Sequence, residues 1–268
     1  MNDGTIDNHE VAKWDPAFTK QVMDAFGPLV KRYFRAEVHN VGNVPAAGGA
    51  LVVSNHSGGM FTPDAFVFSP AFYDTFGYVR PVYTLGHYGL FLGPTEGWLR
   101  RLGVIEASRE NAAAALHSDA VVIVFPGGDY DAYRPTFAAN RIDFNGRTGY
   151  VRTAVEAGVP IVPTVSIGAQ ETQLFLTRGN WLAGKLGLNK LRSDILPVSF
   201  GFPFGLSVFF PPNVPLPSKV VTEVLEPIDV AAQFGADPDI DEVDAHVRSV
   251  MQSALDRLSR QRRFPILG

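Results

Sequence analysis

Short, wholly apolar runs alternate with amphipathic segments along most of the chain. Runs 50–55 (ALVVSN) and 120–126 (AVVIVFP) have the length and the β-branched content of buried strands. Residues 108–117 (SRENAAAALH) predict a helix that Ser108 caps. Further strands are expected over 81–85, 103–107, 160–168 and 220–228, and further helices over 63–72, 147–158 and 241–263. Buried strands that alternate with helices predict an α/β fold, a single domain whose mostly parallel or mixed central sheet has helices on both faces.

Both ends of the chain are predicted to be helical. Residues 15–35 gather their apolar side chains on one side and end in a basic cluster, which predicts an N-terminal amphipathic helix. The pair Gly27-Pro28 is expected to kink or split this helix. The predicted parts are an N-terminal helical segment (1–35), an α/β domain (36–230) and a C-terminal helix of the same domain (231–268).

The stretch 174–192 combines apolar and basic residues without an acid, which predicts an amphipathic helix at an anionic membrane surface. Its cations are Arg178, Lys185, Lys190 and Arg192, with Trp181 among them. The alternative is a surface helix whose apolar side packs on the sheet. The following 24 residues, 195–218, carry no charge, but their six prolines would leave backbone groups unpaired in lipid. This run is therefore expected to form a broken loop and strand rather than a transmembrane helix.

Composition narrows the possible chemistry. The 23 Lys and Arg against 27 Asp and Glu leave a net charge of −4, which argues against a nucleic-acid partner. The absence of cysteine excludes a thiol nucleophile and thiolate metal sites. The six histidines are scattered without an HExxH motif, so no metal site is expected. No basic and apolar leader is visible, so we expect an intracellular protein, soluble or peripheral to a membrane.

One block of residues offers a general base. The strand over 50–55 runs directly into His56, and Gly58-Gly59 and then Pro63-Asp64 follow. A histidine whose ring is oriented by a carboxylate can take the proton of a hydroxyl group or of water. The plainer alternative is that His56 bonds a loop carbonyl while Asp64 sits in the first turn of a helix, where acids are common.

Three more blocks lie at predicted junctions of strand and helix, where open α/β sheets place ligands. They are Gly103 to Arg109, Phe125-Pro126-Gly127-Gly128, and Val159-Pro160 to Pro163. Paired glycines after an apolar strand let backbone N–H groups face a ligand oxygen, or they simply make a tight turn. Each of these blocks is weak evidence when taken alone.

In this order, the four blocks resemble NHxxxxD, GxxxxxR, [FV]PEG and VPxxP of the glycerolipid and phospholipid acyltransferases, a family that includes the 1-acylglycerol-3-phosphate acyltransferases. Two positions depart from that pattern. Phe61 stands where the family has its acid, and the first acid is Asp64, eight residues after His56. Gly127 replaces the glutamate of the third block. The resulting Pro-Gly-Gly block is similar to the branch of the family that forms neutral lipids.

The resemblance implies transfer of a fatty acyl group from a thioester to a lipid hydroxyl. His56 would be the general base and Asp64 would orient it. The substrate-binding candidates are Asn55, Arg109, Gly127, Gly128 and Arg147. Asn55 and the two glycines would shape the pocket or donate to the developing oxyanion, and Arg109 would pair with a phosphate of the acceptor or of coenzyme A.

The same resemblance defines the expected partners. The acyl donor is acyl-CoA or an acyl carrier protein, used as a co-substrate, and no further cofactor is expected. The acceptor is a lipid, which places the protein at the cytoplasmic face of a membrane as a peripheral protein of phospholipid or glycerolipid synthesis. Two alternatives stay open at this point, a non-catalytic lipid-binding protein on the same fold and an acyl thioesterase.

Overall fold

The fold is built around a seven-stranded mixed sheet with the strand order β1-β10-β6-β2-β5-β3-β4. The computed structural model describes all residues except 1–9, 139, 188–193, 210–212, 265 and 267–268. The strands of this sheet are β1 (Glu37–His39), β2 (Ala50–Ser54), β3 (Val82–Gly86), β4 (Val104–Glu106), β5 (Val121–Val124), β6 (Ile161–Ile167) and β10 (Val221–Val224). Strands β2 to β6 run parallel to their neighbours, and β10 is antiparallel to β6. The carboxyl ends of five strands therefore meet at one edge.

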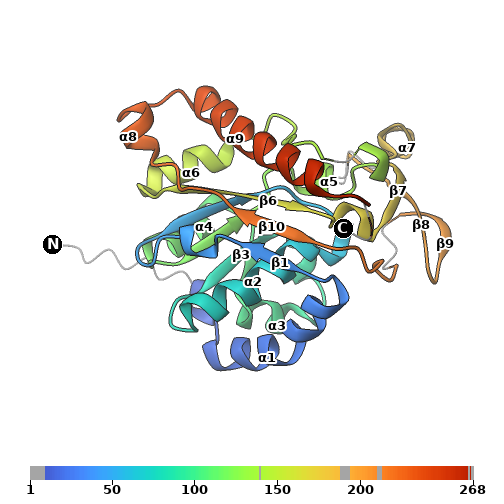
Figure 1. Cartoon of the computed structure of the whole chain (residues 1–268), viewed down its shortest axis with the longest axis horizontal. Coiled ribbons are helices and arrows are strands. Elements are labelled where there is room, and N and C mark those ends of the chain that lie inside the picture. Colours follow the sequence, from blue (N-terminus) through green and yellow to red (C-terminus); the bar gives the residue numbers. More distant parts are fainter. Residues whose placement is uncertain (1–9, 139, 188–193, 210–212, 265, 267–268) are drawn as a thin grey trace.

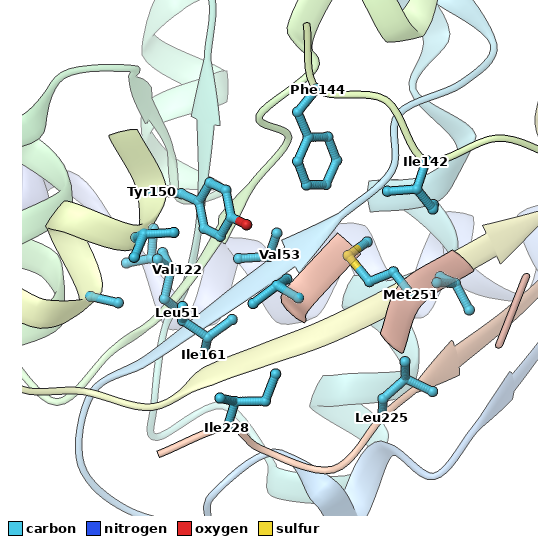
Figure 2. Close-up of a cluster of buried hydrophobic side chains, with 14 of the residues drawn as sticks. Leu51, Val53, Val122, Ile142, Phe144, Tyr150, Ile161, Leu225, Ile228 and Met251 are labelled. Atoms are coloured by element: carbon cyan, nitrogen blue, oxygen red, sulfur yellow. The ribbon is translucent and has the colours of Figure 1, made fainter. Parts of the chain in front are cut away.

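Helices cover both faces of this sheet (Figure 1). The helices of the described residues are α1 (Pro16–Tyr33), α2 (Pro63–Phe76), α3 (Glu96–Arg101), α4 (Arg109–His117), α5 (Gly128–Ala132), α6 (Gly149–Ala157), α7 (Asn180–Lys185), α8 (Val230–Phe234) and α9 (Ile240–Gln261). Leu51 and Val53 of β2 face the core that contains Met251 of α9 (Figure 2). Val52 points to the opposite face and joins the core that contains Phe72 of α2. Because both faces are covered, successive residues of the strand are all apolar, and the predicted α/β fold is confirmed.

The N-terminal helix corrects the split, one of the two alternatives predicted for Gly27-Pro28. A single helix, α1, runs from Pro16 to Tyr33, so it is not split at Gly27-Pro28. Asp15 caps it by accepting the N–H of Phe18 at 2.9 Å. Gly27 is buried against α2, where an added Cβ would lie 3.5 Å from Pro70 Cβ. Packing of α1 on α2 thus keeps the helix continuous past the proline.

A second, small antiparallel sheet lies beside the central one. Its strands are β7 (Leu174–Thr177), β8 (Val198–Gly201) and β9 (Gly205–Val208), in the order β7-β8-β9. It corrects the expected helix over 174–192, because β7 forms the first part of that stretch and, among its described residues 174–187, α7 (Asn180–Lys185) is the helical part. The chain turns at Gly179, which has φ +63° and lies so close to Leu196 that a Cβ there would clash with its carbonyl.

The expected broken loop and strand over 195–218 is the β8–β9 hairpin and the segment that follows it. Lys190 and Arg192, two cations of the predicted membrane segment, lie outside the described residues. In the part of the chain that the structure covers, no helix is both long enough and apolar enough to cross a bilayer.

Candidate active site

The predicted base lies at the carboxyl edge of the central sheet, directly after β2. The loop between β2 and α2 uses left-handed backbone at Gly58 (φ +77°), Gly59 (φ +62°) and Thr62 (φ +40°). A short 3-10 turn, Gly59–Phe61, takes up the additional residues between histidine and acid. Gly58 has no room for a side chain, since an added Cβ would lie 2.6 Å from Pro63 Cδ. The loop therefore curls back and returns the start of α2 to the end of β2.

This curled loop brings His56 and Asp64 together despite their longer spacing. The His56 Nδ1 and the Asp64 Oδ2 are 3.5 Å apart. Asp64 is buried at the second position of α2, and its Oδ2 also accepts the main-chain N–H of Ser57 at 2.7 Å. Catalytic hydrogen bonds are often long before substrate binds and tighten in the complex. The carboxylate therefore lies beside Nδ1, the nitrogen through which an acid orients a catalytic imidazole.

The imidazole is also held on one face. The rings of His56 and Phe125 stack with centroids 4.4 Å apart and an interplanar angle of 26°. Phe125 comes from the loop after β5, the strand next to β2. Only 14% of the His56 side chain is exposed, so most of the ring is shielded from water.

A second buried carboxylate, Asp131, holds the backbone of the same loop. Its Oδ2 accepts the main-chain N–H of His56 at 2.8 Å, and its Oδ1 accepts from Arg134 at 2.6 Å. Burial raises the pKa of Asp131 to about 6, against the opposing effect of the Arg134 guanidinium. Asp131 belongs to α5, which follows the Pro-Gly-Gly block. An acid a few residues after those glycines is the only sequence signal for it, and the sequence does not reveal its partner.

The structure gives Asn55 a place different from the predicted substrate contact. Its Nδ2 donates to the carbonyl oxygen of Ser166 and its Oδ1 accepts the N–H of Ser166, both at 2.8 Å. Asn55 is buried, and Ser166 is part of β6. The amide thus continues the pairing of β2 and β6 by one residue and fixes the exit of the chain toward His56. This geometry favours a structural role.

Gly127, Gly128 and Arg147 form one contact group beside the His56 loop. The Arg147 guanidinium donates to the Gly127 carbonyl at 2.8 Å and to Asp129 Oδ1 at 3.0 Å. An added Cβ at Gly127 would lie 2.5 Å from Asp131 Cβ, and one at Gly128 would lie 2.7 Å from an Arg147 nitrogen. The two glycines therefore make room for a carboxylate on one side and for a guanidinium on the other.

Arg109 lies at the same edge of the sheet but apart from this group. It is the first residue of α4, after β4, and its side chain is exposed. Strand β4 is three positions from β2, which places the two strand ends roughly 14 Å apart at ordinary strand spacing. The structure therefore does not bring Arg109 to His56, although both residues border the same face of the molecule.

The fourth predicted block has a structural place. Pro160 precedes β6, and its carbonyl accepts the N–H of Leu51. Pro163 lies within β6 opposite Val53 of β2. Among the described residues, no group of three or more His, Asp or Glu side chains is arranged to hold a metal ion.

Fold and site together define an α/β protein with a His–Asp pair at the carboxyl edge of its sheet, an arrangement suited to deprotonating a hydroxyl group. A family model described as Acyltransferase matches residues 35–167. An uncharacterized protein of Mycobacterium tuberculosis is 34% identical over 265 residues, which cover 95% of this chain and 70% of that protein. The chain belongs to the glycerolipid acyltransferase family and is an acyltransferase.

Two further comparisons, one with a protein of related sequence and one with a solved structure, name proteins to which this chain is similar. The "DGAT1/2-independent enzyme synthesizing storage lipids" of Bos taurus is 26% identical over 241 residues, covering 85% of this chain and 66% of that enzyme. The crystal structure of the 1-acyl-sn-glycerophosphate (LPA) acyltransferase PlsC of Thermotoga maritima superposes with a TM-score of 0.53 at 20% identity. That match covers 94% of this chain and 84% of PlsC, and it shows that the two proteins share a fold.

Proposed function

We propose that this acyltransferase moves a fatty acyl group from an acyl thioester to a lipid hydroxyl, with His56 as the general base and Asp64 as the residue that orients it. The observation that carries the proposal is the buried Asp64 carboxylate 3.5 Å from His56 Nδ1 at the end of β2. An imidazole held in this way presents Nε2 to a substrate, as the histidine of a hydrolase triad does.

The proposed step needs no nucleophile from the enzyme. His56 Nε2 takes the proton of the acceptor hydroxyl while its oxygen attacks the thioester carbonyl carbon. The tetrahedral intermediate then collapses, the carbon–sulfur bond breaks, and the leaving thiolate receives the proton from the imidazolium. Asp64 stabilises the imidazolium that exists between these two transfers. The mechanism fits a chain that contains no cysteine.

The Pro-Gly-Gly block supplies the candidate for stabilising the oxyanion. Of the three predicted donors, the N–H of Gly128 donates to the Phe125 carbonyl at 2.9 Å and the Asn55 amide donates to Ser166, so we assign the oxyanion to the N–H of Gly127. A preorganised donor of this kind is most effective in a site that excludes water. Arg147 holds this turn through the Gly127 carbonyl. The more distant Arg109 is suited to a phosphate carried by coenzyme A or by the acceptor.

We propose a neutral lipid alcohol as the preferred acceptor. The support is the Pro-Gly-Gly block in place of Pro-Glu-Gly, together with the similarity to a bovine enzyme named for storage-lipid synthesis. The donor is acyl-CoA or an acyl carrier protein, which serves as a co-substrate with no further cofactor. Because acyl chain and acceptor both reside in a bilayer, we place the protein at the cytoplasmic face of a membrane as a peripheral protein.

The test is consumption of acyl-CoA across a panel of acceptors, with His56→Ala as the inactive control. The panel contains glycerol phosphate, lysophosphatidate, monoacylglycerol, diacylglycerol and a long-chain alcohol. We expect ester formation with the neutral acceptors. Equal thioester consumption without any acceptor would identify a thioesterase, and no consumption by an intact, lipid-binding protein would favour a non-catalytic role. Ester formation with lysophosphatidate alone would overturn the proposed acceptor class.

A further inference from the structure

The β8–β9 hairpin turns its apolar side away from the protein. In cross-strand pairs, Ser199 lies opposite Ser207, and Phe200 lies opposite Leu206. The serine pair faces inward, with its hydroxyl oxygens 3.4 Å apart, and Ser199 is buried. Phe200 and Leu206 are both exposed. Antiparallel sheets on a protein surface ordinarily bury the apolar side and expose the polar one, so this hairpin is inverted.

The tip of the hairpin extends the apolar face. It is formed by Phe202-Pro203-Phe204, whose phenylalanines are 76% and 53% exposed. The exposed apolar set of this region comprises Leu176, Phe200, Phe202, Phe204, Leu206, Val208 and Phe209. We call this set the hairpin surface. Figure 1 shows β8 and β9 as an arm that projects beyond the end of the central sheet, and the residues of the hairpin surface are exposed. Contiguous apolar surface of this kind marks a site of interaction.

The distribution of charge around the hairpin surface indicates which kind of partner it binds. The sequence from Ile195 to Ser218 contains no charged residue, and residues 174–187 contain cations but no acid. On α7, which lies at the same end of the molecule, Lys185 Nζ is 5.3 Å from the ring centroid of exposed Trp181. An uncharged apolar projection bordered by tryptophan and lysine matches a bilayer, where tryptophan favours the interface and cations favour anionic headgroups.

The small sheet is also fixed to the candidate active site. Phe175 of β7 packs against the His56 loop, where a Cβ added at Gly59 would lie 2.8 Å from Phe175 Cζ. Its ring also lies edge-on to Tyr133, with centroids 5.2 Å apart. On the same side, Arg178 Nε donates to the carbonyl of Tyr130 at 2.7 Å. The hairpin is therefore attached to the loops that hold His56, and it has a fixed position relative to the site.

The N-terminal helix carries a second exposed apolar stripe. Phe26, Leu29 and Tyr33 are exposed on α1. The Tyr33 hydroxyl donates to the carbonyl of Pro215, which lies after the hairpin in the chain. This hydrogen bond joins the end of α1 to the segment that contains Pro215.

We propose that the β8–β9 hairpin is a membrane wedge, which inserts Phe202 and Phe204 among the acyl chains of an anionic bilayer and holds the His56 site at the lipid surface. The purpose of the docking rests on the proposed function. Its location rests on the geometry of the hairpin. A bilayer covers the apolar face without a protein partner. In this orientation Lys185 of α7 would lie at the level of the lipid headgroups. The wedge would let an acceptor lipid reach His56 without leaving the membrane.

The experiment measures binding to vesicles in the absence of any thioester, so its result does not depend on catalysis. The full chain is mixed with phosphatidylcholine vesicles with and without phosphatidylglycerol. Phe202→Ser/Phe204→Ser should bind at least about tenfold more weakly, because the variant lacks the two aromatic side chains that transfer from water into the bilayer. The matched control is Val79→Ser, which changes a side chain 90% exposed in the loop before β3, at the opposite edge of the sheet. It should bind like the wild type.

A second measurement locates the hairpin directly. Because the chain has no cysteine, Phe202→Cys takes a single environment-sensitive fluorophore, and Val79→Cys takes the same label as a control. Vesicles should shift the emission of the label at position 202 to shorter wavelength and leave the control label unchanged.

Three results would overturn the wedge. One is unchanged vesicle binding by the double serine variant with an unchanged thermal midpoint. Another is an unshifted label at position 202 while the protein is bound to vesicles. The third is a wild-type dimer that the double variant converts to a monomer, which would assign the surface to a second copy of this chain. Failure of the proposed function appears elsewhere, as absent ester formation with acceptors dispersed in detergent.

Discussion

In the central sheet, all residues of β2 and β6 are buried, whereas in the small sheet the buried position of β8 is Ser199 and the exposed one is Phe200. Both sheets contain apolar strand residues, yet among the described elements the central sheet alone has helices on both of its faces. The difference shows that the same hydrophobic content serves packing in one place and leaves an apolar surface in the other.

The division extends to chemistry. The central sheet presents His56, Asp64 and Asp131 at its carboxyl edge, where the two buried carboxylates accept the main-chain N–H groups of Ser57 and His56. The small sheet contributes hydrophobic surface and a neighbouring lysine. If the two regions have separate functions, variants of the first should lose turnover and keep vesicle binding, and variants of the second should do the reverse.

The largest effect is expected from His56→Ala, which removes the proposed base. Losing a general base typically lowers the rate by a factor on the order of 10²–10⁴. The main-chain bond from residue 56 to Asp131 does not need the imidazole, so the thermal midpoint should change little. Steady-state kinetics with acyl-CoA, beside a vesicle-binding assay, checks both halves of the prediction.

His87→Ala is the matched control for this variant. His87 is exposed and follows β3 at the same edge of the sheet, and its Nδ1 accepts the N–H of Gly89 within its own loop. It should keep wild-type turnover. Full activity of His56→Ala would remove His56 from the mechanism.

Asp64→Asn should come next, with a loss of turnover of roughly 10²-fold, the lower end of what general-base catalysis contributes. An amide at position 64 can no longer stabilise the imidazolium, and it can favour the wrong ring tautomer. The buried N–H of Ser57 still finds an acceptor, so the fold should persist. The measurement is kcat and KM for the acceptor, with kcat carrying the loss.

Asp74→Asn provides the comparison, because Asp74 is an exposed acid near the other end of α2. It should be fully active. An Asp64→Asn variant with normal kcat would leave the orienting role to another group.

Most of the central sheet could be predicted because burial on both faces leaves a plain signal. Strands such as 50–55 and 120–126 are uninterrupted apolar runs, and the structure places β2 and β5 within them. The small sheet could not be predicted in the same way. Its alternation of serine with phenylalanine specifies a strand, but it does not tell which side faces water, since that depends on what covers it. The apolar and basic residues of 174–192 likewise predict one helix, because the pattern does not show that the first part of the stretch pairs with β8 as a strand.

The site shows a similar limit. The order of the blocks predicts that His56 and Asp64 act together. In the structure the two residues are close because Gly58 and Gly59 adopt left-handed backbone conformations, and both glycines are visible in the sequence. The contact of Asp131 with His56 joins residues 75 positions apart, and no local pattern encodes it. The amide of Asn55 likewise finds its partner 111 positions away, in β6, so its structural place could not be derived from its neighbours.

The buried carboxylate of Asp131 predicts how the free energy of unfolding depends on pH, an effect that the uncharged hairpin should not share. Its folded-state pKa is raised from 3.8 to about 6, so the folded protein binds this proton more tightly than the unfolded chain does. The contribution of Asp131 to stability should therefore fall as pH rises from about 4 to about 6, and stay constant above that. The difference amounts to about 2–3 kcal/mol.

The measurement compares urea unfolding of the wild type and Asp131→Asn across this range. The free energy of unfolding of the wild type, relative to that of the variant, should decline with rising pH. A relative stability that increases instead would mean that Arg134 dominates the environment of the carboxylate. Phe202→Ser/Phe204→Ser, which alters the hairpin alone, should follow the wild-type profile.

The smallest expected effect belongs to Lys185→Gln, which removes one cation beside the hairpin. A Lys near an anionic leaflet contributes about 1 kcal/mol, so vesicle binding should weaken about fivefold at low salt. The difference should shrink at high salt, because exposed charges are then screened, and it should vanish on neutral vesicles. Arg257→Gln is matched in charge, but Arg257 already pairs with both oxygens of Glu223, so its loss should change binding less. An equal decrease for both variants would show that the membrane senses net charge rather than the position of Lys185, and the hairpin surface would then carry the specificity of docking through its phenylalanines alone.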